Sequence, residues 1–270
     1  MMAVPSVRFC MTTVANPGSL ERASAQAAAV RHGVPFAERG PGSLAALLEE
    51  NGLEAALVLG RESAALFFEG KLHTWRAGMG ELRLKRLRSG ERGPRKTRDS
   101  FLEAASLRRG DLVLDATLGL GMDALVAAEA VGEEGLVLGV EASPLLAAWV
   151  AEGLLRHGSS AAGRVRVACE DALSFLARLP EGSVDVVVFD PMFAEPQKEG
   201  PLFGLVRRLG DARPLYPELL RRACAVARRF VVVKDGSGGA ELARLGLAPL
   251  SGPRSARRRY GRLPAKGAAL

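Results

Sequence analysis

Residues 112–123 read Leu-Val-Leu-Asp-Ala-Thr-Leu-Gly-Leu-Gly-Met-Asp. The apolar run predicts a buried strand that ends at Asp115, and the glycines Gly119 and Gly121 predict a tight turn into a helix. In open parallel sheets, ligands bind beyond the carboxyl ends of the strands. The stretch therefore predicts an α/β sheet with a ligand site next to this turn.

A second apolar strand ends in a different way. Residues 186–193 read Val-Val-Val-Phe-Asp-Pro-Met-Phe. A carboxylate and a turned backbone carbonyl can accept both hydrogens of an exocyclic base amine, while an aromatic ring stacks on the base. An ordinary strand end, with the proline breaking the ladder and the phenylalanine in the core, is the alternative. The candidate catalytic residues are Asp190, Pro191, Met192 and Phe193.

The order of the predicted strands and helices divides the chain into two regions, with a boundary at residue 98. Residues 99–270 predict strands alternating with helices, which indicates a parallel sheet covered on both faces. Residues 1–98 predict a small α/β accessory domain followed by a basic linker over 88–98. The predicted strands cover 7–14, 55–59, 64–69, 112–115, 136–141, 165–168, 184–190 and 230–234, and the predicted helices cover 19–32, 43–51, 100–107, 123–130, 144–157, 172–179 and 217–227.

The acids around the glycine turn indicate which ligand it binds. Asp115 and Asp123 flank the turn, which disfavours a pyrophosphate, and the chain has no Gly-Lys-Ser/Thr of a P-loop. A cationic, zwitterionic ligand such as S-adenosylmethionine (SAM) suits them better, and Glu141 is placed to bind its ribose hydroxyls. NAD is the competing ligand, disfavoured because Ala124 takes the third position of Gly-x-Gly-x-x-Gly. Glu170 and Asp171 are either adenine contacts or helix N-caps.

Positive charge gathers in two segments of a chain whose net charge is +7. Residues 71–98 hold ten Lys and Arg against two Glu, and residues 251–270 hold six against no acid. Such segments suit a polyanion such as RNA. Solvated arginine-rich faces and a disordered tail are the alternative.

These residues carry a resemblance to a known family. The sequence resembles the RsmJ family of small-subunit ribosomal RNA guanine-N2 methyltransferases. The resemblance is carried by residues 115–123, by Glu141 before a proline, by residues 189–193 with Gln197 and Lys198, and by residues 231–234. Gly78-Met79 and a helix over 82–87 resemble an uncharacterised Gram-positive branch of that superfamily. The resemblance implies a Rossmann-like class I SAM-dependent methyltransferase fold, with a seven-stranded, mostly parallel sheet and an added N-terminal domain.

The resemblance completes the candidate sites. The cofactor set is Asp115, Thr117, Gly119, Gly121, Met122, Asp123, Glu141, Ala142, Glu170, Asp171 and Asp190. The nucleic-acid set is Arg83, Lys85, Arg86, Arg88, Arg95, Lys96, Arg98, Lys198 and Lys234.

We therefore expect a SAM-dependent methyltransferase that modifies an exocyclic base amine of the guanine-N2 type in RNA, most plausibly ribosomal. A methyltransferase for a small molecule or protein amide, or a non-catalytic RNA-binding protein with a degenerate donor pocket, are the alternatives. No cysteine or histidine spacing predicts a metal site. We expect a cytoplasmic location without membrane association, because no long apolar segment or signal-peptide pattern occurs.

Overall fold

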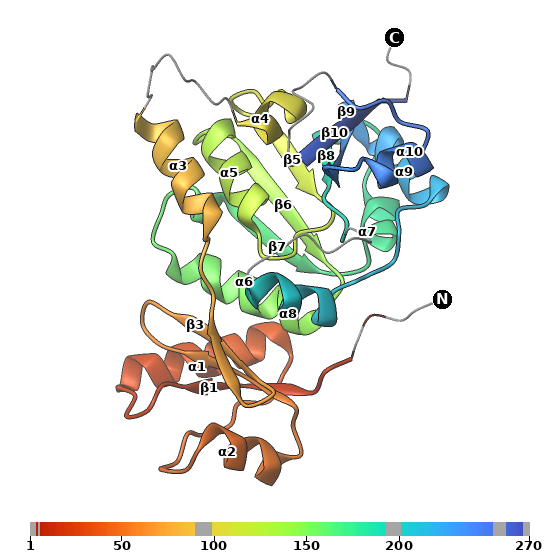
Figure 1. Ribbon diagram of the computed structural model, residues 1–270. Coiled ribbons are helices and arrows are strands. Elements are labelled where there is room, and N and C mark those ends of the chain that lie inside the picture. Colours follow the sequence, from red (N-terminus) through yellow and green to blue (C-terminus); the bar gives the residue numbers. More distant parts are fainter. Residues whose placement is uncertain (1–3, 5, 90–98, 193–200, 251–257, 267–270) are drawn as a thin grey trace.

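Two β-sheets organise the protein, which is described by a computed structural model (Figure 1). The structure describes residues 4, 6–89, 99–192, 201–250 and 258–266. The smaller sheet has the order β1-β2-β3-β4, in which β1 and β2 are parallel and the other pairs antiparallel. Its elements are β1 (Phe9–Thr13), α1 (Ser19–His32), α2 (Leu44–Asn51), β2 (Ala55–Leu59), β3 (Ala64–Phe68) and β4 (Lys71–Thr74).

The larger sheet has the order β10-β9-β8-β5-β6-β7, and only β10 runs antiparallel to its neighbour. Its strands are β5 (Leu112–Asp115), β6 (Leu136–Glu141), β7 (Val165–Cys169), β8 (Val184–Phe189), β9 (Ala227–Gly236) and β10 (Arg258–Pro264). The helices around it are α3 (Met79–Ser89), α4 (Ser100–Ala105), α5 (Met122–Val131), α6 (Pro144–Arg156), the 3-10 turn η1 (Ala162–Arg164), α7 (Ala172–Arg178), α8 (Pro201–Leu209), α9 (Pro217–Val226) and α10 (Ala240–Arg244).

Both faces of the large sheet are buried, as the continuous apolar strands predict. Alternate residues of one strand enter different clusters: Val113 shares a cluster with Leu125 and Trp149 of α5 and α6, whereas Leu114 shares one with Leu176 of α7 and with residues of α9. The predicted Rossmann-like α/β fold is thus confirmed in its layers and in the direction of its strands.

The strand order changes direction between β5 and β8. From β5 the chain proceeds outward through β6 and β7, and then returns to the other side of β5 for β8 and β9. The loops after β5 and β8 consequently leave the sheet in opposite directions and open a crevice between them. This places both quoted stretches at one point of the fold.

The small sheet is joined to the large domain by a continuous core. The indole Nε1 of Trp75 donates a hydrogen bond to the Leu120 carbonyl, and that of Trp149 donates to the Ala64 carbonyl, both at 3.2 Å. Gly153 of α6 leaves space for the Trp75 ring, which a Cβ would overlap. The boundary predicted at residue 98 stays a prediction, since buried residues of both sheets share one cluster.

Several elements differ from the sequence prediction. Helix α3 extends to Ser89, so the predicted linker starts inside a helix, and its residues 90–98 lie outside the described part. The basic segment at the C-terminus forms β10 over residues 258–264. In the described residues the large sheet has six strands instead of the expected seven, although Leu250 donates a hydrogen bond of 2.7 Å to the Tyr260 carbonyl of β10. Among these residues no helix is both long and apolar enough to cross a bilayer.

Candidate functional site

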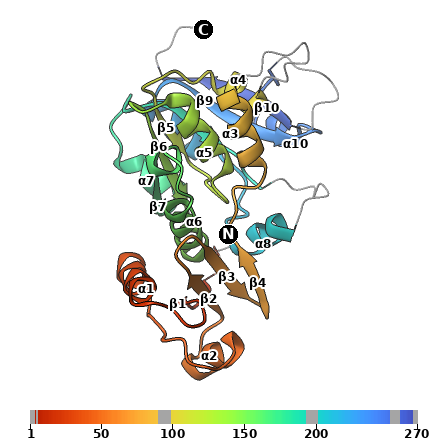
Figure 2. The same ribbon diagram turned by 90° about the vertical axis from the view of Figure 1, so that its left-hand side faces the viewer.

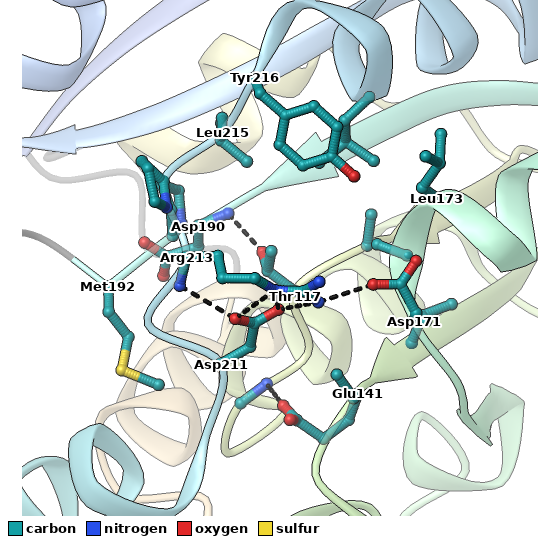
Figure 3. Close-up of a pocket in the computed structure, with 18 of the residues that line it drawn as sticks. Thr117, Glu141, Asp171, Leu173, Asp190, Met192, Asp211, Arg213, Leu215 and Tyr216 are labelled. Atoms are coloured by element: carbon teal, nitrogen blue, oxygen red, sulfur yellow. Dashed lines mark hydrogen bonds and ion pairs between the residues drawn. The ribbon is translucent and has the colours of Figure 1, made fainter. Parts of the chain in front are cut away.

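A pocket lies at the carboxyl ends of β5, β6, β7 and β8 (Figure 3). Each of these strand ends contributes to its wall, and the segment between α8 and α9 closes the remaining side. Eight of the predicted site residues line it: Thr117, Gly119, Glu141, Ala142, Asp171, Asp190, Pro191 and Met192.

The glycine turn after β5 forms one wall of this pocket. Gly119 and Gly121 have φ of 51° and 73°, which are left-handed values that glycine adopts without strain. The Gly121 N–H donates to the Leu118 carbonyl at 2.8 Å, and Gly121 is also the N-cap of α5, where no side chain caps the helix. The sequence therefore folds here into a narrow turn that brings bare backbone to the pocket wall.

Glu141 at the end of β6 faces the turn. Its Oε2 accepts a hydrogen bond from the Gly119 N–H at 3.1 Å, and its Oε1 accepts from the Ser143 N–H at 2.9 Å. The residue is 6% exposed, and burial raises the pKa of its carboxyl to about 7, although both backbone N–H groups favour the charged form. It is a fixed acceptor at the place where the sequence predicts a ribose contact.

Asp190 connects the second quoted stretch to the first. Its backbone N–H donates to Thr117 Oγ1 at 2.6 Å, and its carboxylate Oδ2 accepts from Lys234 Nζ at 2.6 Å. Burial raises the pKa of Asp190, whereas the Lys234 charge opposes that rise. Pro191 and Met192 continue along the pocket wall, while Phe193 lies outside the described residues.

An arginine lies in the pocket between two carboxylates. Figure 3 shows Arg213 between Asp171 and Asp211, to which it donates hydrogen bonds at 2.6 Å and at 2.5–2.8 Å. Asp171 is also the N-cap of α7, because its Oδ1 accepts from the Ser174 N–H at 3.0 Å. The N-cap alternative for Asp171 is thus confirmed, and the same side chain lines the pocket.

Five predicted cofactor residues lie outside the pocket lining. Asp115 is buried beneath the turn, where its Oδ1 accepts from the Thr117 N–H at 3.2 Å. Glu170 pairs with Arg178 on the surface. The others are Gly121, which packs toward Val150, Met122, which packs against Gly78 and Gly80 of the α3 region, and Asp123, which is bound by Arg83 and Lys234.

The predicted nucleic-acid residues fall into three groups. Lys85 and Arg86 are exposed on α3, and Arg88 next to them pairs with Glu129. Arg83 and Lys234 are predicted to bind nucleic acid, but their partners are internal carboxylates and their side chains are only 19% and 13% exposed, so the geometry does not offer them to phosphates. Arg95, Lys96, Arg98 and Lys198 lie outside the described residues.

Sequence reasoning missed one wall of the pocket, formed by Val206 of α8 and the segment 211–216. This wall includes the charged pair Asp211 and Arg213 and the apolar side chains of Leu215 and Tyr216. Gly210 at its start leaves space for the Met192 methyl group. The one signal was a run of polar, proline and aromatic residues between two helices, which is also typical of an ordinary loop.

A family model of SAM-dependent methyltransferases matches residues 91–246, more than half of the chain. The chain belongs to this family. The matched residues include every strand end around the pocket, from Asp115 to Asp190, and the missed wall at 211–216.

Relatives of this methyltransferase include proteins with and without a stated activity. It is 37% identical over 186 residues to the uncharacterized protein YpiP of Bacillus subtilis, covering 66% of this chain and 70% of that one. It is 40% identical over 141 residues to a ribosomal RNA small subunit methyltransferase J of Laribacter hongkongensis, covering 48% of each chain. The corresponding protein of Pseudomonas aeruginosa is 32% identical over 188 residues, covering 58% and 70%. The resemblance to the RsmJ family is thereby confirmed.

A solved structure supports the fold of the methyltransferase along nearly its whole length. A SAM-dependent methyltransferase from Neisseria gonorrhoeae superposes with a TM-score of 0.60 at 20% identity, covering 96% of this chain and 97% of that chain. The likeness extends over both sheets, so the N-terminal elements belong to the shared fold.

SAM is the methyl donor of this enzyme, as its family establishes. The pocket suits that molecule chemically, because carboxylates outnumber cations around it and SAM carries a sulfonium and an ammonium against one carboxylate. In the described part of the chain no cluster of three His, Cys, Asp or Glu side chains could hold a metal ion.

Proposed function

We propose that this methyltransferase transfers the methyl group of SAM to an exocyclic base amine of the guanine-N2 type in small-subunit ribosomal RNA. The observation that carries the proposal is the position of Asp190, which lines the pocket and whose backbone N–H is hydrogen-bonded to Thr117 of the glycine turn. A donor bound at the turn and a base at Asp190 would share one cavity.

The donor would lie across the strand ends. Glu141, fixed by the Gly119 and Ser143 N–H groups, would accept the ribose hydroxyls, and the bare turn around Gly119 would approach the amino-acid portion. The apolar side chains of Leu173, beside Asp171, and of Leu215, next to Tyr216, line the pocket, and they would pack on the adenine ring. When bound, SAM would supply a methyl group already activated by its sulfonium and would leave as S-adenosylhomocysteine, while the methylated amine would release one proton to water.

The acceptor would be oriented by the strand end of β8. An aromatic amine delocalises its lone pair into the ring, so it attacks poorly unless its nitrogen is turned toward the methyl group. The Asp190 carboxylate would accept one amine hydrogen and a backbone carbonyl of the turn at Pro191 the other. Positioning of this kind can account for most of the rate acceleration, because the donor needs no further activation.

RNA as the acceptor is supported by two observations. Relatives of 32–40% identity are named ribosomal RNA small subunit methyltransferase J. In addition, Lys85 and Arg86 are exposed on α3, which packs on α5 beside the domain that holds the pocket (Figure 2). The chain aligns with about half of the Laribacter enzyme, so the target nucleotide is proposed by class only.

The test is methyl transfer from tritiated SAM to small-subunit ribosomal RNA, offered free and within assembled subunits, followed by digestion to nucleosides and mass spectrometry. We expect N2-methylguanosine in the product. Asp190→Asn should lower the rate by about 10²-fold. Asp185→Asn is the matched control at the opposite end of β8, where the carboxylate binds Leu112 and Arg228, and it should keep near-normal activity. Label confined to protein or small molecules would refute the RNA assignment.

A further inference from the structure

Lys234 lies at the centre of a chain of ion pairs behind the pocket. Its Nζ donates to Asp190 Oδ2 at 2.6 Å and to Asp123 Oδ2 at 2.7 Å. The side chain is 13% exposed, so little water competes for these contacts. Lys234 therefore joins the carboxylate of the proposed base site to helix α5.

The far side of this chain is also fixed. Arg83 of α3 donates to Asp123 and, at 2.6 and 3.0 Å, to both oxygens of Asp99. Asp99 is itself the N-cap of α4, accepting the N–H groups of residues 101 and 102 at 3.1 Å. Asp123 is consequently held by Arg83, and it in turn restrains the ammonium of Lys234.

The charges of this chain nearly balance. Asp99, Asp123 and Asp190 supply three carboxylates, while Arg83 and Lys234 supply two cations. One negative charge therefore remains when all are ionised. That excess suits methyl transfer, in which positive charge passes from the sulfonium to the attacked amine nitrogen. The net negative charge of these protein groups stabilises that positive charge.

We propose that Lys234 is a positioning residue for methyl transfer, which keeps the Asp190 carboxylate ionised and fixes its orientation toward the target amine. The inference deepens the proposed function and rests on its assignment of Asp190 to the base. A carboxylate offers about four acceptor positions. The contact from Lys234 to Oδ2 thus leaves acceptor positions for the hydrogens of an amine.

The groups that face Asp190 decide its ionisation. Burial raises the pKa of this carboxyl and the charge of Asp123 on α5 raises it further, with Asp115 of β5 also near. Lys234 of β9 and Arg258 of β10 lower it. Tyr260 of β10 also faces Asp190 and Lys234, and its hydroxyl is neutral near pH 7 because burial raises its pKa to about 12. Burial alone would lower the pKa of Lys234, but Asp123 and Asp190 raise it, so the ammonium stays charged at neutral pH. Removal of the Lys234 charge should therefore move Asp190 toward its neutral form, which accepts fewer hydrogen bonds.

A salt bridge that serves stability alone is the competing explanation, since many buried ion pairs have no catalytic part. The variants Lys234→Met and Lys234→Arg separate the two, and Arg229→Met is a matched control. Arg229 pairs with Asp111 at the other end of the same strand, with a side chain 17% exposed. Loss of that pair should change the unfolding temperature and leave the kinetics of methyl transfer unchanged.

For Lys234→Met we expect kcat for RNA to fall by about 10²-fold, with the KM for RNA and the Kd for SAM within about threefold of the wild type. The acidic limb of the kcat profile should move to higher pH, and Lys234→Arg should recover part of the loss. If Lys234→Met does not fold, the double variant Asp123→Asn with Lys234→Met removes one acid and one cation together. Its kcat is then compared with that of the single variant Asp123→Asn. An unchanged kcat in the folded variant would overturn the proposal.

A second readout needs no RNA. Carbon-13 carboxyl NMR of aspartate-labelled protein, with the Asp190 signal assigned by Asp190→Asn, follows its titration in wild type and Lys234→Met. We expect its midpoint to rise by about one pH unit or more in the variant. An unchanged midpoint would refute the role of Lys234, whatever the substrate. A raised midpoint together with no RNA methylation by the wild type would instead support Lys234 and refute the proposed function.

Discussion

The hydroxyl of Thr117 accepts a hydrogen bond of 2.6 Å from the backbone N–H of Asp190. This bond joins the loop after β5 to the loop after β8, the two strands between which the sheet order reverses. It fixes the distance between the proposed donor site and the proposed base site. The bond therefore couples two stretches of sequence about seventy residues apart.

Substitution of Thr117 tests this coupling. Thr117→Val keeps the shape of the side chain but leaves the Asp190 N–H without its acceptor, which costs about 1–3 kcal/mol for a buried donor. We expect methyl transfer to fall by about tenfold or more while SAM still binds, because the base site moves relative to the donor. Steady-state kinetics with a calorimetric titration of SAM would measure both effects. Thr117→Ser retains the hydroxyl and should stay within about threefold of the wild type.

Asp115 should link SAM binding and stability to pH. Burial, and then the charge of Asp123, raise its pKa to about 7 in the folded protein, from 3.8 as the ordinary value. A carboxyl with a raised folded pKa stabilises the fold below its unfolded pKa, and that contribution is lost as the pH rises through the folded pKa. As the pH rises from 4 to about 7, the stability that Asp115 contributes to the SAM-free protein should therefore be lost.

Asp115→Asn removes that titration and keeps the oxygen that accepts the Thr117 N–H. Relative to wild type, we expect the SAM-free variant to gain about 2–3 kcal/mol of stability as the pH rises from 5 to 8. Its affinity for SAM should fall at pH 8, where the wild-type carboxylate is charged and attracts the sulfonium. Thermal unfolding and calorimetry at both pH values measure this. An identical pH dependence of stability in variant and wild type would contradict the assignment.

The strand ends were readable from sequence because a buried strand is a continuous apolar run and its end is marked by the first polar residue. Asp115, Glu141 and Asp190 are all placed in this way, and Gly119 and Gly121 adopt the positive φ that their pattern indicates. Local sequence thus determines both the fold class and one side of the pocket.

Tertiary contacts determine the rest, and local patterns do not report them. From the sequence we predict that Lys234 binds phosphate. In the structure its partners are the carboxylates of Asp123 and Asp190, which come from other elements. Arg213 reaches the pocket because the segment after α8 folds back over the strand ends. β10 was missed because its sequence, Arg-Arg-Tyr-Gly-Arg-Leu-Pro, lacks an apolar run: Arg262 is held by the carbonyls of Glu103 and Ala104 and stacks on Phe230.

Arg213 should contribute to SAM binding through Asp171. Its guanidinium binds both the Asp171 carboxylate at the pocket wall and Asp211. Burial alone would raise the pKa of Asp171, but the Ser174 N–H and the Arg213 guanidinium together lower it. Arg213→Met would leave two carboxylates close together and release the segment that carries Tyr216. We expect the Kd for SAM to rise by about tenfold, measured by calorimetry. Arg178→Met is the matched control, since it breaks the exposed pair with Glu170 at the same strand end but outside the pocket, and it should leave the Kd unchanged.

Charge reversal on α3 tests whether this helix contacts RNA. Lys85 and Arg86 are exposed there, whereas Arg83 on the same helix is engaged with Asp99 and Asp123. Lys85→Glu with Arg86→Glu should weaken RNA binding and flatten its salt dependence by about one unit of slope for each phosphate that the variant no longer binds. Affinities measured by filter binding from 50 to 300 mM salt, on the order of physiological ionic strength, would give the slope.

The control for that experiment carries the same change of charge elsewhere on the surface. Arg221 on α9 and Lys266 near the C-terminus are 72% and 67% exposed and pair with Glu218 and Glu181. Arg221→Glu with Lys266→Glu alters the net charge equally, so it reports the effect of overall charge on a polyanion. If RNA binding depends on α3, its double variant should lose at least about tenfold more affinity than this control, with SAM binding equal in both. Equal losses in the two variants would mean that α3 makes no specific contact, because net charge alone would then account for the change.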